Sequence, residues 1–291
     1  MKKGSITQLF TVLCFAVAVG LQFAVSTVLS SMYSGGQLTE KGYVYGAYLV
    51  PQLCYIISIG VFLAVQRVPL GRVFRTENIK PTPYLYMILI ALGLFFVALL
   101  PNIYLQNAIR SSGSNSSVLL PPMETAGENV LAVLLICLLP AIGEEMMFRK
   151  TFCDGMEGNN EWVIVLLGGL FFSLSHYNLV QTVHQFVLGC VLCFLYVRTR
   201  NISLTMIAHF LNNLLALYIA RWTESFLDWN DTVTLVVAFF AGLILLATGT
   251  IITYLKTKKI KGDGKVEPYT IGLVAFVGVV WLVSVVTSFV S

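Results

Sequence analysis

The sequence predicts an all-α polytopic membrane protein, a bundle of about eight to nine transmembrane helices around a buried polar cavity. Of the 291 residues, 57% are hydrophobic and only 11% are charged, and the mean hydropathy is +0.82. A soluble domain carries about 25% charged residues, and a disordered chain combines low hydrophobicity with high net charge. The composition therefore excludes both classes and indicates an integral, multi-pass membrane protein.

Uncharged runs divide the chain into helix-length segments. One span needs about 20 apolar residues at a rise of 1.5 Å each. The run 162–197 would form a rod of roughly 54 Å, so we expect it to fold back as two helices with a turn in the polar stretch between Ser175 and Thr182. The predicted spans are 8–31, 44–66, 83–105, 130–155, 161–178, 181–197, 202–221, 232–255 and 269–290.

The fourth span reaches membrane length only if it contains charge. Its apolar part ends near Gly143, and the helix must continue through Glu144, Glu145 and Arg149 to about residue 155. Pro140 lacks a backbone N–H and, together with Gly143, loosens the helix just before the carboxylates. The sequence therefore predicts a water-containing cavity beside them.

The distribution of basic residues predicts the orientation, since Lys and Arg gather in cytoplasmic segments. With a cytoplasmic N-terminus, fifteen of the eighteen basic residues fall on the inner side. The exceptions are Lys41, Arg110 and Arg221. We therefore expect the N-terminus to be cytoplasmic, in the cell membrane if the source is prokaryotic.

Six cysteines lie in or beside the predicted spans and do not suggest a disulfide framework. Cys190 and Cys193 are separated by two residues, which is the spacing of a metal-binding or redox pair. No second ligand pair accompanies them, so we interpret them as small packing residues.

Ionisable groups at bilayer depth cost roughly 2.5–3.5 kcal/mol each on insertion scales and therefore indicate a function. They recur on three spans, and residues four apart on a helix share a face. The expected same-face pairs are Glu145 with Arg149, Phe172 with His176, and His209 with Asn213.

Glu144 is turned by about 100° from Glu145 and is left without a cation on its own helix. Such a carboxylate in an apolar setting suits a general base. Counting depth along the helices places Glu144, His176, His209 and Asn213 at overlapping levels, so we expect all four to meet in one layer.

Plainer interpretations exist for these residues. A glutamate–arginine pair can be a buried structural salt bridge in a transporter. His184, which has no partner at helical spacing, is expected to make an interhelical hydrogen bond.

The ordered motifs carry a resemblance. Glu144-Glu145-x-x-x-Arg149, Phe172-x-x-x-His176 and His209-x-x-x-Asn213 resemble the three motifs of the CAAX-protease and bacteriocin-processing (CPBP, or Abi) family of intramembrane endopeptidases. The similarity covers residues 130–221. It divides the single membrane domain, 1–291, into N-terminal accessory spans (1–129), the catalytic core (130–221) and C-terminal spans (222–291).

The resemblance implies a peptide hydrolase with a cavity open towards the cytoplasm. Glu144, with His176, would activate a water for attack on a peptide carbonyl. His209 and Asn213 would donate hydrogen bonds to the oxyanion. Glu145 and Arg149, the remaining members of the catalytic set, would be structural or would assist Glu144.

The resemblance leaves the cofactor question open. Glu144, His176 and His209 could hold zinc with an open position for water. A cofactor-free mechanism is favoured, because the sequence has no His-Glu-x-x-His helix and asparagine is a poor zinc ligand. The expected partners are the lipid bilayer and a hydrophobic or prenylated peptide or protein substrate, with no nucleic acid. The alternatives are a non-catalytic membrane scaffold, a bacteriocin self-immunity protein and a proton-coupled transporter.

Overall fold

A computed structural model describes residues 3–65, 67, 82–112, 120–223, 231–259 and 262–289. Its regular elements are helices, and across these ranges the extended pairing is a single isolated bridge between Asn159 and Gly264. The elements are α1 (Lys3–Ser34), α2 (Glu40–Val65), α4 (Thr82–Ser111), α5 (Ala126–Ala132), η1 (Val133–Leu138), α6 (Leu139–Glu145), η2 (Met146–Cys153), α7 (Glu161–Leu174), α8 (Leu179–Thr199), α9 (Ile202–Thr223), α10 (Thr232–Lys256) and α11 (Pro268–Thr287).

The predicted all-α membrane architecture is confirmed. Among the described residues, eight helical segments are long and apolar enough to cross a membrane, judged by length and composition. The remaining predicted span, 161–178, the fifth along the chain, corresponds to α7, which has only 14 residues because the helix ends at Leu174. The side on which the N-terminus lies stays a prediction, and the segment with Arg72, Arg75 and Lys80 that supports it is outside the described residues.

The run 162–197 folds back as two helices, as predicted. The last turn of α7 ends at Ser175, Tyr177 adopts a left-handed backbone with φ 49°, and Asn178 caps α8 by accepting from the Gln181 backbone N–H at 3.3 Å. These turn conformations reverse the chain within four residues. The reversal places His176 between α7 and α8, deep in the bundle.

The fourth span is less regular than an α-helix. Wide π-type turns at η1 and η2 flank α6, and the Leu139 backbone N–H bonds the Leu134 carbonyl five residues back. Pro140, in the first turn of α6, has no N–H with which to continue an α-helical ladder. The predicted loosening before Glu144 is confirmed, although it takes the form of wide turns.

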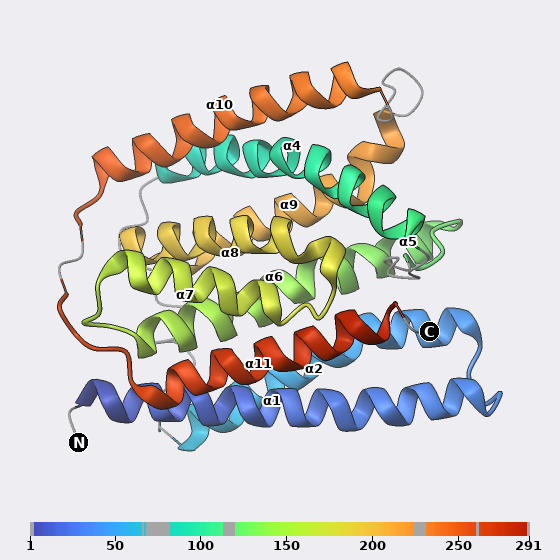
Figure 1. Cartoon of the computed structure of the whole chain (residues 1–291), viewed down its shortest axis with the longest axis horizontal. Coiled ribbons are helices and arrows are strands. Elements are labelled where there is room, and N and C mark those ends of the chain that lie inside the picture. The colour runs from blue at the N-terminus through green and yellow to red at the C-terminus, as the bar shows by residue number, and fades with distance from the viewer. Residues whose placement is uncertain are drawn as a thin grey trace.

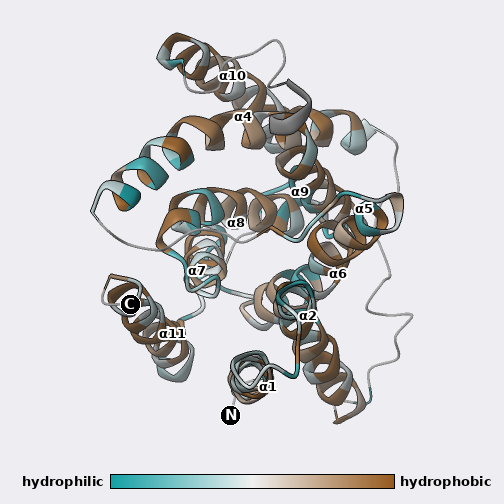
Figure 2. Cartoon of the chain, turned by 90° about the vertical axis from the view of Figure 1, so that its right-hand side faces the viewer, coloured by the Kyte–Doolittle hydropathy of each residue, from teal (hydrophilic) through white to brown (hydrophobic). Residues whose placement is uncertain are grey.

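The helices lie along the long axis of the molecule in three groups (Figure 1). Helices α4 and α10 pack against each other on one side, and α1, α2 and α11 lie on the opposite side. Between them lie α6, η2, α7, α8 and α9, which carry the polar motifs. Apolar residues cover most of the ribbon when the bundle is seen end-on, including the outer helices α10 and α11 (Figure 2). This pattern fits a bundle that faces lipid.

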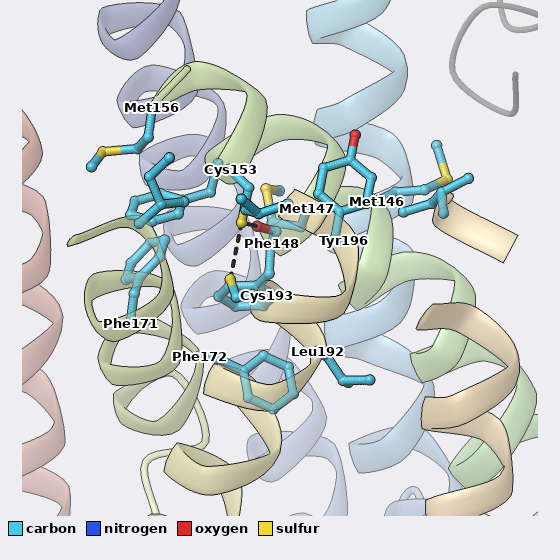
Figure 3. Packing of buried hydrophobic residues seen from close by; sticks show 14 of the residues in the cluster. Met146, Met147, Phe148, Cys153, Met156, Phe171, Phe172, Leu192, Cys193 and Tyr196 are labelled. Carbon is cyan, nitrogen blue, oxygen red and sulfur yellow. Dashed lines mark hydrogen bonds between the residues drawn. The ribbon is translucent and has the colours of Figure 1, made fainter. Parts of the chain in front are cut away.

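The largest apolar cluster joins η2 to α7, α8 and α1 (Figure 3). The Phe148 ring contacts Phe171 and Phe172 edge-to-face, with centroids 5.4 and 5.0 Å apart. All six cysteines are free thiols, and the sulfurs of Cys153 and Cys193 lie 2.9 Å apart. As predicted, Cys193 is a packing residue of this cluster, and Cys190 packs against it.

Glycines allow α4 and α10 to approach closely. A Cβ added at Gly93 would lie 2.5 Å from the Leu246 backbone nitrogen, and one at Gly242 would lie 2.8 Å from the Val97 nitrogen. Contacts between backbones of this kind are how helices associate in lipid, where the hydrophobic effect contributes little between them. The close packing of α4 against α10 therefore depends on glycine, which has no side chain, at positions 93 and 242.

We expect Gly93→Ala to destabilise the protein by about 1–3 kcal/mol, because the new methyl group overlaps backbone that cannot move aside. Thermal unfolding in detergent measures the effect. Gly60→Ala in α2 is the matched control, since a Cβ there meets nothing within 4 Å. Equal melting temperatures for the two variants would contradict this account of the α4–α10 contact.

Candidate active site

The Glu144 carboxylate faces a cavity and is held from one side. Its Oε1 accepts a hydrogen bond of 2.9 Å from Nε2 of Gln52 on α2. Gly143 makes this contact possible, because a Cβ there would lie only 3.1 Å from Oε1 of Gln52. Oε2 of Glu144 has no hydrogen-bond partner among the described residues. One carboxylate oxygen is therefore oriented by the protein, and the other is buried without a hydrogen-bond partner in the described structure.

Glu145, the neighbouring carboxylate, is fully buried, with an ion-pair contact on one oxygen and a hydrogen bond on the other. Its Oε2 lies 3.2 Å from Nε of Arg149, which confirms the predicted pair one turn apart. Its Oε1 lies 2.9 Å from Nδ1 of His209 on α9. Both side chains of the Glu145–Arg149 pair have no exposed surface. Two adjacent glutamates thus have different environments, one facing the cavity and one locked in an ion pair.

Phe172 connects this ion pair to both histidines. The Arg149 guanidinium lies 4.7 Å from the centre of the Phe172 ring, which favours a cation–π contact. The same ring packs edge-to-face against His176 at 4.8 Å, as predicted, and against His209 at 5.8 Å. His176 Nδ1 donates to the Phe172 carbonyl at 2.8 Å, which leaves Nε2 as the nitrogen that can accept a proton. Phe172 therefore fixes the planes of both imidazoles.

Asn213 is positioned by the break in the fourth span. Its Nδ2 donates to the Ile136 carbonyl at 3.1 Å. In a regular helix the N–H of residue 140 would bond this carbonyl, and Pro140 has none to offer. The proline therefore frees the oxygen that orients the Asn213 amide. An amide nitrogen carries two hydrogens, so one remains for another acceptor.

One cavity of about 400 Å³ joins these groups. Its lining includes Glu144, His176, His209 and Asn213, so the four residues expected in one layer do meet. Glu145 and Arg149 lie behind the cavity wall and not in it. The catalytic roles assigned from the resemblance stay predictions at this point.

Three residues near the site were missed or underestimated from the sequence. Gln52 belongs to an accessory span that was expected to supply only the membrane setting, yet it bonds Glu144. A polar residue directly after Pro51 in an apolar span was the available signal. His184 makes the expected interhelical hydrogen bond, accepting from Nδ2 of Asn212 at 3.4 Å, and both residues also line the cavity.

The residues at the site do not form a metal centre as they stand. Within the ranges that the structure describes, no three His, Cys, Asp or Glu side chains are placed to hold a metal ion together. Among the proposed zinc ligands Glu144, His176 and His209, Nδ1 of each histidine bonds a carbonyl or a carboxylate, as in metal-bound histidines, so these bonds do not speak against a metal and only the placement of the side chains does. We therefore derive no chemical step through a metal.

The segment that builds this site matches a known family. The model of the family described as type II CAAX prenyl endopeptidase Rce1-like matches residues 126–215. The resemblance to the CPBP family is confirmed. The Rce1-like segment includes the three motifs from Glu144 to Asn213, whereas Gln52 lies outside it.

A curated relative supports the same class. The protein named "Putative membrane peptidase YdiL" of Bacillus subtilis (strain 168) is 24% identical over 188 residues, which is 62% of this chain and 75% of that protein. No solved structure matches the chain significantly. Together, the family match and this relative support a membrane peptidase.

We expect Arg149→Met to destabilise the protein by about 3–5 kcal/mol, because it leaves the Glu145 carboxylate buried without its cation. Lys150→Met is the matched control, since Lys150 is partly exposed and pairs with Asp154 at 2.9 Å on the same helix. An exposed pair contributes about 0–1 kcal/mol. Unfolding in detergent compares the two variants, and similar losses of stability would contradict the buried-pair interpretation.

Proposed function

We propose that the protein is an intramembrane endopeptidase in which Glu144 activates a water molecule for attack on a peptide bond. The observation that carries this proposal is the environment of Glu144. It faces the cavity with one oxygen fixed by Gln52 and the other without a hydrogen-bond partner in the described structure. The membrane-peptidase relatives give the reaction class.

In this proposal the attacking water bridges Glu144 and His209. Oε2 of Glu144 and Nε2 of His209 are 3.9 Å apart, too far for a direct hydrogen bond. A water at about 2.8 Å from both atoms spans this distance. Glu144 takes a proton from the water, and the resulting hydroxide adds to the carbonyl carbon of the substrate. When the C–N bond breaks, Glu144 returns the proton to the departing amine.

His209 and Asn213 would stabilise the oxyanion. Asn213 has a second amide hydrogen beyond the one bonded to Ile136. His209 would donate from Nε2 in its imidazolium form, with the ring held by the bond from Nδ1 to the Glu145 carboxylate. His176 Nε2 offers a second acceptor for the water, in agreement with the role expected beside Glu144. The donors are held before the substrate arrives, which is the condition for strong electrostatic catalysis.

The walls of the cavity suit an apolar substrate. Besides the polar groups, the lining includes Ala47, Tyr48, Tyr55, Phe148 and Leu217. A volume of about 400 Å³ is enough for a few side chains of a peptide in extended form. We therefore propose a hydrophobic or lipidated peptide segment as the substrate, with prenylated protein tails as the first class to test.

Glu144→Gln tests the mechanism most directly. The amide keeps the shape of the side chain but cannot accept the proton, so we expect peptide release to fall at least about 100-fold while the melting temperature changes little. Mass spectrometry of peptides released in membranes with either form measures cleavage.

Glu157→Gln is the control for this experiment, because Glu157 is an exposed carboxylate paired with Arg200 outside the cavity. Unchanged peptide release by Glu144→Gln would eliminate the glutamate mechanism. If that variant also complements a deletion strain fully, the protein acts as a scaffold.

Gln52→Met tests whether the accessory helix α2 orients the base. We expect kcat to fall about tenfold, the equivalent of one hydrogen bond to a charged group, with KM changed by less than about threefold. Gln22→Met is the matched control, because Gln22 lines the same cavity from α1. A parallel loss in both variants, or a change confined to KM, would assign Gln52 to substrate binding instead.

A further inference from the structure

A second cavity lies among the ends of α4, α8, α9 and α10. It has a volume of about 610 Å³ and shares no lining residue with the candidate active site. Its walls come from the first turn of α4, the last turn of α8, the residues before α9 and the end of α10. These helix ends gather on one side of the molecule in Figure 1. The cavity therefore lies where membrane-spanning helices end, at the level of lipid head groups.

The cavity is positively charged. Its lining contains Arg198, Lys256 and Lys258, and none of the described lining residues is acidic. Lys256 and Lys258 are exposed, and neither takes part in an ion pair with another described residue. Within the described ranges, the carboxylate that forms an ion pair with this group is Glu161, which pairs with Arg198. Two positive charges are left over after that pair.

Arg198 forms the rigid wall of the cavity. Its side chain is 1% exposed, and Nη2 lies 2.8 Å from Oε1 of Glu161. Nη1 donates to the Thr257 carbonyl at 3.4 Å, and the guanidinium lies 4.5 Å from the centre of the Tyr254 ring. Nε is buried and has no hydrogen-bond partner within the described residues. Arg198 therefore adds a fixed positive charge to the wall of the cavity, which favours an anion there.

Helix ends of both polarities border the cavity. Helix α4 begins at Thr82 and α9 begins at Ile202, so two helix N-termini with their partial positive charge border the cavity. Asn201 caps α9 by accepting from the Leu204 N–H at 3.1 Å. The C-terminal ends of α8 and α10, which favour cations, carry Arg198 and Lys256 in their last turns. The cations of the cavity are thus held in place by the fold.

We propose that this cavity binds a phosphate group, presented by the head group of an anionic phospholipid. Arg198 and the two lysines supply the charge, and Thr82 and Thr199 line the same space. A phosphate that bridges α10 to α8 and α9 would tie the α4–α10 pair to the helices that carry the candidate site. The head group is anchored at the membrane boundary, where this cavity lies.

Native mass spectrometry of the full-length protein in a neutral detergent tests the proposal, with dioctanoyl-phosphatidylglycerol as the probe. We expect one tightly retained lipid, and Lys256→Gln/Lys258→Gln should weaken its binding at least about tenfold, since each basic residue near the surface contributes about 1 kcal/mol. Lys259→Gln/Lys265→Gln is the control, because it removes the same charge from exposed lysines outside the cavity.

Two further binding measurements identify the source of the phosphate. Inorganic phosphate that displaces the lipid, or binds in its place, assigns the cavity to phosphate itself, while retention of the lipid alone assigns it to a head group. Dioctanoyl-phosphatidylcholine should bind more weakly because its choline cation opposes the lysines. Equal retention of the probe by the wild type and both double variants, or equal losses in both, would overturn the proposal.

Discussion

The buried pair of Glu145 and Arg149 is the constraint on which the centre of this protein depends. Neither side chain has exposed surface, and each charge alone in an apolar bundle would cost several kcal/mol. The pair lowers that cost by bringing the charges to 3.2 Å, and His209 takes the remaining carboxylate oxygen. The η2 segment is thereby fixed against α9, and Glu144, the preceding residue, must face the cavity.

Phe172 contacts both this pair and the two histidines, and so links their positions. The Arg149 guanidinium lies over the Phe172 ring, and the imidazoles of His176 and His209 pack edge-to-face against the same ring. An aromatic ring inside an apolar cluster has few alternative orientations. The result is a polar site whose geometry is set by packing, which suits chemistry that requires donors to be in place beforehand. The ring is part of the same cluster as Phe148 and Phe171, so the site and the core are one structure.

Breaks in regular helix geometry supply the rest of the site. Pro140 leaves the Ile136 carbonyl free for Asn213, and Gly143 lets α2 approach until Gln52 reaches Glu144. The turn after α7 leaves His176 at the end of a short helix in the interior of the bundle. Each break gives up regular helical hydrogen bonds inside a membrane protein, and each presents a polar group to the same cavity. This agreement supports a functional explanation of the irregular backbone.

The sequence by itself determined the class of fold, the position of nearly every helix and the candidate residues that line the cavity. Apolar length sets where spans lie, and the 3.6-residue period sets which neighbours share a face, so Glu145 with Arg149 and Phe172 with His176 were predictable from spacing alone. Contacts between helices distant in the chain were not, because they depend on how side chains pack in three dimensions. Only the tertiary structure joined His209 to Glu145, brought Gln52 from α2 to Glu144, and gathered the ends of four helices around a basic cavity.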